Sequence, residues 1–164
     1  MIGYKTSYIL DKSEMLYLLS GFAAAPPLFP AQYILSQYLA DGVVGPEAAD
    51  GLLFKQILSL NDGKLVMEPV VNLMVRAALT ADKLWIVGTE GDKTQFILRS
   101  KFMFMYIVEY PLIEGAWKII PYQKAAEMVD ELKAVAITSV KVVDGQERQY
   151  ELTRRNGFSW LEEN

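Results

Sequence analysis

The sequence contains neither cysteine nor histidine, and these two absences exclude many kinds of functional site. Without cysteine there can be no disulfide, no thiolate metal ligand and no cysteine nucleophile. Without histidine the usual zinc sites and the Ser-His-Asp triad cannot form, and the most common general base near pH 7 is missing. We therefore expect a protein that is not an enzyme, has no catalytic residues and binds neither a cofactor nor a metal ion.

Sequence motifs that carry chemistry without these residues are also lacking. There is no Gly-x-Gly-x-x-Gly pattern and no P-loop. Tyr8 and Lys12 have the spacing of the Tyr-x-x-x-Lys pair of short-chain reductases, but that pair requires a Rossmann fold before it. The carboxylates of Glu127, Asp130 and Glu131 cluster on an expected helix, where such a run is usually a solvated face.

The charges show no basic segment. The chain has 16 Lys and Arg against 20 Asp and Glu, a net charge of −4, and both signs are spread along its length. Binding to phosphate backbones normally requires clustered Lys and Arg, so we do not expect a nucleic-acid partner. A hydrophobic fraction of 52% with 12% aromatics is enough for a folded core, which makes bulk disorder an unsuitable interpretation.

One uncharged stretch is long enough to cross a bilayer. No charged residue occurs over residues 15–40. However, Gly21, Pro26, Pro27 and Pro30 interrupt it, and a lipid-facing helix cannot leave that much backbone unpaired. Residues 1–5 also lack the basic-then-apolar pattern of a signal peptide. We therefore expect a soluble, cytoplasmic protein that does not bind membranes.

The first half of the chain is expected to be mainly helical. Asp11 with Glu14 three residues later is a capping-box pattern, and it predicts the start of a helix that ends near Gly21. The other expected elements are an edge strand or extended lead-in over 3–9, helices over 30–41, 46–60 and from 69 onward, a turn over 61–63 and an extended piece over 65–67.

Beyond residue 82 the apolar pattern changes to that of strands. The expected strands cover 84–87, 94–99, 102–108, 117–120, 137–143 and 149–154, with one helix over 122–133. Helices first and strands later predict an α+β fold, with N-terminal helices followed by an antiparallel sheet and one packed helix. We expect residues 1–164 to form a single domain, with a sub-boundary near residue 82 if there is one.

Two apolar features have both a structural and a functional interpretation. The run over residues 102–106 is either a central strand buried on both faces, which we favour, or an adaptable binding strip rich in methionine. The tryptophans Trp85, Trp117 and Trp160 favour core packing, although tryptophan is also enriched at interfaces. Trp160 is the one most expected to be exposed, which makes it a candidate partner contact.

Four stretches of helix, turn and strand signals follow one another at residues 10–19, 51–69, 81–87 and 117–121. In this order they resemble the EspG family of type VII secretion chaperones, and also short uncharacterised proteins from Gram-positive secretion loci. The resemblance covers roughly residues 8–133. It implies a non-enzymatic chaperone with a central antiparallel sheet, which holds a helical secreted protein in the cytosol before export.

The resemblance also implies where the partner binds. Client contacts in this family lie partly on loops of the sheet, so Glu90, Asp92 and Lys93 are the nearest candidates by position. A homodimer is compatible with this interpretation. Two alternatives stay open: a transcriptional regulator with a winged-helix-like segment over residues 46–88, and a small-molecule-binding domain with an apolar pocket.

Overall fold

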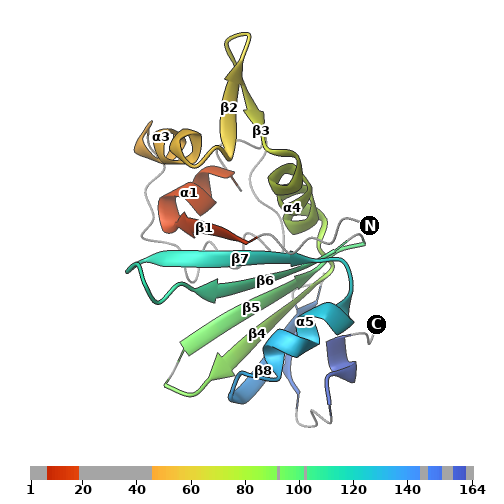
Figure 1. Cartoon of the computed structure of the whole chain (residues 1–164). Coiled ribbons are helices and arrows are strands. Elements are labelled where there is room, and N and C mark those ends of the chain that lie inside the picture. The colour runs from red at the N-terminus through yellow and green to blue at the C-terminus, as the bar shows by residue number, and fades with distance from the viewer. Residues whose placement is uncertain are drawn as a thin grey trace.

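The computed structural model describes residues 7–18, 46–91, 93–101, 103–144, 148–152 and 157–161, and its fold is of the α+β class (Figure 1). The strands are β1 (Tyr8–Asp11), β2 (Leu58–Asn61), β3 (Lys64–Met67), β4 (Lys83–Thr89), β5 (Lys93–Arg99), β6 (Phe104–Glu109), β7 (Ala116–Tyr122), β8 (Ile137–Asp144) and β9 (Gln149–Glu151). The helices are α1 (Lys12–Leu16), α3 (Pro46–Phe54), α4 (Pro69–Thr80), α5 (Ala125–Leu132) and the 3-10 helix η2 (Ser159–Leu161). The helix predicted over residues 30–41 lies outside the described residues.

Seven strands form one sheet in the order β1-β7-β6-β5-β4-β8-β9. All neighbouring strands in it run antiparallel, which confirms the predicted antiparallel sheet. Strands β4 to β7 follow one another as a meander, β8 and β9 extend the sheet beyond β4, and β1 lies beside β7 (Figure 1). Because β1 precedes the helices and still joins this sheet, the expected order of helices first and sheet afterwards does not hold for this strand.

The third predicted helix ends six residues earlier than expected. α3 stops at Phe54, and Gln56 adopts a positive φ of 62°, which breaks the helix. Residues Leu58–Asn61 instead pair with Lys64–Met67 as a separate two-stranded hairpin. Its turn is Asp62 and Gly63, both at positive φ, as hairpins with two-residue loops require. The apolar residues of this stretch were compatible with either a helix or a strand, and cross-strand pairing decided between them.

The sheet is buried on both faces. Along β4, Leu84 and Ile86 belong to one apolar cluster and Trp85 and Val87 to another, because successive side chains of a strand point to opposite faces. Helices α1 and α4 pack on the first face and α3 packs on α1, while α5 and η2 pack on the second face (Figure 1). A sheet that is apolar on both faces needs cover on both, so α1 and α4 pack on it as well as α5, the late helix that was expected there.

The unusual run that includes Met103, Met105 and Tyr106 lies in the middle of this arrangement. β6 pairs with β5 on one side and with β7 on the other. Met105 faces the first cluster and Tyr106 the second, and these two side chains are 4% and 2% exposed. The interpretation as a central strand buried on both faces is confirmed. Phe102 lies outside the described residues.

The last helix begins later than expected. It was predicted over residues 122–133, but Pro121 still lies within β7, opposite Met105. β7 continues to Tyr122, and α5 begins only at Ala125.

Among the described residues, no helix is long and apolar enough to cross a bilayer.

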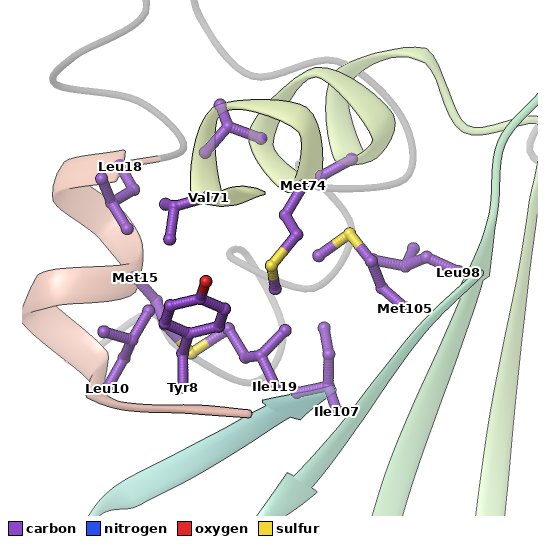
Figure 2. A pocket seen from close by; sticks show the side chains of 12 residues that line it. Tyr8, Leu10, Met15, Leu18, Val71, Met74, Leu98, Met105, Ile107 and Ile119 are labelled. Atoms are coloured by element: carbon purple, nitrogen blue, oxygen red, sulfur yellow. The ribbon is translucent and has the colours of Figure 1, made fainter. Parts of the chain in front are cut away.

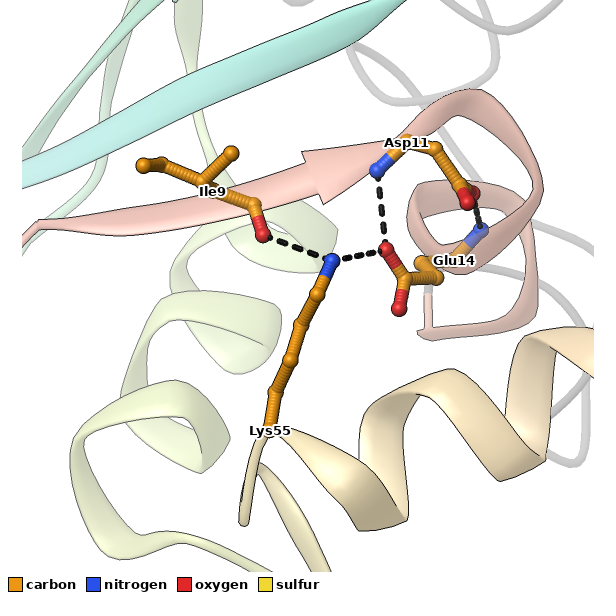
Figure 3. Close-up of polar contacts among 4 residues, drawn as sticks. All are labelled: Ile9, Asp11, Glu14 and Lys55. Atoms are coloured by element: carbon orange, nitrogen blue, oxygen red, sulfur yellow. Dashed lines mark hydrogen bonds and ion pairs between the residues drawn. The ribbon is translucent and has the colours of Figure 1, made fainter. Parts of the chain in front are cut away.

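The start of α1 is built around a buried carboxylate (Figure 3). Asp11 Oδ1 accepts the Glu14 N–H at 2.7 Å, and Glu14 Oε1 accepts the Asp11 N–H at 2.9 Å, which confirms the predicted capping box. Glu14 is only 2% exposed, and its charge is paired with Lys55 Nζ at 2.5 Å. Gly51 provides the space for this carboxylate, since a Cβ there would lie 2.6 Å from Glu14 Oε2. The contact joins α3 to the β1–α1 junction.

We expect Gly51→Ala to destabilise the protein, although the same change in an unconstrained helix is stabilising by about 1 kcal/mol. The added methyl displaces a buried, paired carboxylate, and overpacking of this kind costs about 1–3 kcal/mol. Chemical denaturation measures the difference in the free energy of unfolding. In a Glu14→Ala background the same substitution should regain its stabilising sign, and an equal loss of stability in both backgrounds would contradict this account.

Candidate functional site

A groove of about 800 Å³ lies at the ends of β5, β6 and β7. Its walls come from the start of β5, the end of β6, the loop over residues 110–115, the start of β7 and Lys12 of α1. Glu109 and Trp117 lie opposite each other in the β6–β7 pairing, so the groove begins where the covered part of the sheet ends. The volume is within the range of about 300–1,000 Å³ that is typical of binding sites.

The loop over residues 110–115 carries two exposed apolar side chains, of which Ile113 lines the groove and Leu112 is its neighbour in the chain. The Tyr110 N–H donates to the Ala116 carbonyl at 2.9 Å, and the Ala116 N–H donates to the Ile113 carbonyl at 3.2 Å. Gly115 closes the loop at a positive φ of 77°. With its backbone held in this way, the loop leaves Leu112 79% exposed and Ile113 55% exposed.

The lining of the groove is mixed rather than charged with one sign. It includes two cations, Lys12 and Lys93, and two carboxylates, Glu109 and Glu114, so the formal charges cancel. Trp117 also lines the groove, although only 6% of its surface is exposed. A mixed surface of this kind suits apolar contact with local charge pairing better than attraction by overall charge.

Two of the four predicted partner-binding residues lie at this groove or next to it. Lys93 is exposed and lines the groove. Glu90 is exposed in the same β4–β5 turn, whose position is set by a hydrogen bond from the Glu90 N–H to the Ala136 carbonyl at 3.1 Å. Asp92 lies outside the described residues. The role of these residues in binding stays a prediction.

Trp160 does not lie at the groove, and core packing, the favoured interpretation of the three tryptophans, is confirmed for it as for the other two. Its side chain is 4% exposed within the cluster on the second face of the sheet. The indole ring packs edge-on against Trp85 at 6.1 Å and against Phe158 at the same centroid distance. Its Nε1–H has no hydrogen-bond partner in the described part of the chain. Folding of the C-terminal segment onto the sheet, which no local pattern specifies, buries this ring.

Leu112 and Ile113 were not recognised as site residues from the sequence. The signal that could have identified them is the position of two large apolar residues between Pro111 and Gly115, where a loop is expected. An apolar pair in a short surface loop has no core to fill, so its exposure is the informative observation.

The phenol groups in the structure do not form a proton-transfer site. Tyr8 donates its O–H to Glu68 Oε2 at 2.8 Å instead of pairing with Lys12 as in a reductase. Burial and then the Glu68 carboxylate raise the pKa of Tyr8. For Glu68, burial opposes ionisation, but the Val70 and Val71 N–H groups and the Tyr8 hydroxyl outweigh it and lower its pKa. Glu68 thus caps α4 as an anion and joins this helix to β1.

A second hollow lies between α1, α4 and the first face of the sheet, and its lining is apolar (Figure 2). The volume that the centre of a water-sized sphere can occupy inside this hollow is about 30 Å³. An engineered apolar cavity that binds benzene in another protein measures about 150 Å³. The hollow is therefore too small for an organic ligand and is a local defect of packing.

No group of three or more acidic side chains suited to a metal ion occurs among the described residues.

Val71 lines this cavity, and we expect Val71→Ile to stabilise the protein by about 0.5–1 kcal/mol because one methyl group fills empty apolar space. The matched control is Val140→Ile on the opposite face, where Val140 is 1% exposed and lines none of the cavities described here. That change should be neutral or destabilising. Thermal or urea unfolding compares the two, and equal effects would contradict the assignment of the cavity.

We expect the stability of the protein to fall as pH rises above about 10, the ordinary tyrosine pKa. Burial, followed by the Glu131 carboxylate, raises the pKa of both Tyr106 and Tyr122. The folded state therefore keeps protons that the unfolded chain has released, and alkali favours unfolding. Urea denaturation between pH 8 and 11 measures this slope, which should be shallower for Tyr122→Phe. An unchanged slope would show that Tyr122 is not responsible.

The first two stretches of the family resemblance meet in the structure, because Glu14 of the first lies against Gly51 of the second. This contact shows how the two stretches pack but does not assign them to a family. Comparison with known proteins finds no matching family model, no matching curated protein and no matching solved structure.

Proposed function

We propose that this chain is a protein-binding module without catalytic activity, and that it holds its partner in the groove at the ends of β5, β6 and β7. The observation that carries the proposal is the pair Leu112 and Ile113, which are 79% and 55% exposed beside a groove of about 800 Å³. Large apolar side chains exposed next to a concave surface are typical of interaction sites.

The partner that we propose is a helical segment of a secreted protein. The resemblance to type VII secretion chaperones supports this finer proposal. A helix with one apolar face can place that face against Ile113 and Trp117. Lys93 and Glu109 are then available to pair with charges on the flanks of the helix. Such charge pairs at the rim determine orientation more than affinity.

The two alternative functions have less support. In a winged helix the hairpin is a projecting wing, whereas β4 and β5 here are interior strands of the sheet. The hairpin β2–β3 also separates α3 from α4, so these two do not form a helix-turn-helix. For small-molecule binding, the apolar cavity of about 30 Å³ is far too small, which leaves the groove of about 800 Å³. The lining of that groove is mixed, whereas small-molecule pockets are predominantly apolar.

The test is a pull-down from the native cytosol with the tagged chain, followed by mass spectrometry and by affinity measurement with the partner that is captured. The double variant Leu112→Ser with Ile113→Ser should weaken binding at least about tenfold, as expected when apolar anchors are lost. Leu60→Ser is the matched control, since Leu60 is 66% exposed but lies on the β2–β3 hairpin away from the groove lining.

Two outcomes would overturn the proposal. If Leu60→Ser weakens binding as much as the double variant, the partner does not bind specifically at the groove. If the double variant binds with wild-type affinity, the exposed pair is not part of the site.

A charge-reversing change, Lys93→Glu, should alter the salt dependence of association, because an exposed rim charge acts mainly on the association rate.

A further inference from the structure

β1 is the edge strand of the seven-stranded sheet, and its inner side pairs with β7. An edge strand presents backbone groups that can pair with another chain. Two of those groups on β1 are occupied by side chains. The Ile9 carbonyl accepts a hydrogen bond from Lys55 Nζ at 3.0 Å, and the Asp11 N–H donates to Glu14 Oε1 at 2.9 Å.

The two side chains that occupy these groups are bonded to each other. Lys55 Nζ lies 2.5 Å from Glu14 Oε1, so one continuous series of contacts runs from the Ile9 carbonyl to the Asp11 N–H (Figure 3). In a parallel strand pair, the N–H and C=O of a single residue bond the neighbours on either side of the opposite residue. Lys55 Nζ is the donor and Glu14 Oε1 is the acceptor in this ion pair. They take the places that the N–H and the C=O of one residue in an added parallel strand would occupy.

The two groups that the ion pair occupies are also self-complementary. One is an acceptor and the other a donor, and they flank Leu10. If a second β1 ran antiparallel about a two-fold axis at Leu10, each Ile9 carbonyl would accept the Asp11 N–H of the other copy. Both hydrogen bonds of such an isologous contact come from the same two groups. A second copy of this chain is therefore the occupant that the edge fits.

We propose that the Glu14–Lys55 ion pair seals the β1 edge against a second copy of the chain. The seal is accessible, because the Lys55 side chain is 37% exposed while Glu14 is 2% exposed. The capping box of α1 involves Asp11 and Glu14 but not Lys55, so helix capping does not explain the contact between Lys55 and the Ile9 carbonyl. That contact satisfies a backbone acceptor that an added strand would otherwise use.

The test uses the double variant Glu14→Met with Lys55→Met, which frees both the Ile9 carbonyl and the Asp11 N–H and leaves no buried charge unpaired. Sedimentation equilibrium over a range of concentrations compares it with the wild-type chain. The dissociation constant of self-association should fall about thirtyfold in the double variant. This is the change expected from two added backbone hydrogen bonds of ordinary strength. Lys55→Arg retains a charged donor and should behave like the wild-type chain.

A structural defect alone can also cause association, so two further measurements separate the explanations. Leu132→Ala lowers stability from the opposite face of the sheet, where Leu132 is fully buried, and it should leave association unchanged. Residue-resolved hydrogen exchange of the double variant should show protection of the Asp11 amide that increases with protein concentration. The proposal fails if the folded double variant associates no more tightly than wild type, if Leu132→Ala associates equally, or if the Asp11 amide shows no such protection.

Discussion

Burial of both faces of the seven-stranded sheet is the constraint on which the rest of this structure depends. β4 shows it most clearly, because Leu84 and Trp85 are adjacent, point in opposite directions and are 0% and 1% exposed. A strand of this kind is stable only if apolar cover lies on both sides. Helices α1 and α4 on the first face, with α3 packed on α1, and the α5–η2 layer on the second meet that requirement. They leave the strand ends and the sheet edges as the places where function can be sited.

The two edges of the sheet are protected in different ways. β9 is only three residues long and all three are exposed, and a short polar edge is a poor template for another strand. β1 is longer and more apolar, and there two backbone groups are taken by the side chains of Glu14 and Lys55. The groove at the ends of β5, β6 and β7 is a third kind of surface, because the loop over residues 110–115 holds apolar side chains outward next to it.

Elements whose signals are local were predicted well. The capping box of Asp11 and Glu14, the helix start at residue 69 and the apolar run of β4 each depend on residues close in the chain, and each is confirmed. The stretch Leu58–Asn61 was predicted wrongly because its leucines suit a helix as well as a strand. Lys93 was named as a partner contact only through a resemblance, and no groove was predicted beside it. Leu112 was overlooked because a loop pattern does not state which side chains remain exposed.

The sequence by itself determined the chemistry that this protein lacks, the period of its strands and the ends of several helices. These properties follow from residue types and from neighbours close in the chain. Only the tertiary structure decided that Lys55 reaches the Ile9 carbonyl across 46 positions and that Trp160 is buried against Trp85. The physical reason is that burial and pairing between distant segments depend on how the whole core packs, and the same side chain is an exposed contact or a core residue according to what covers it.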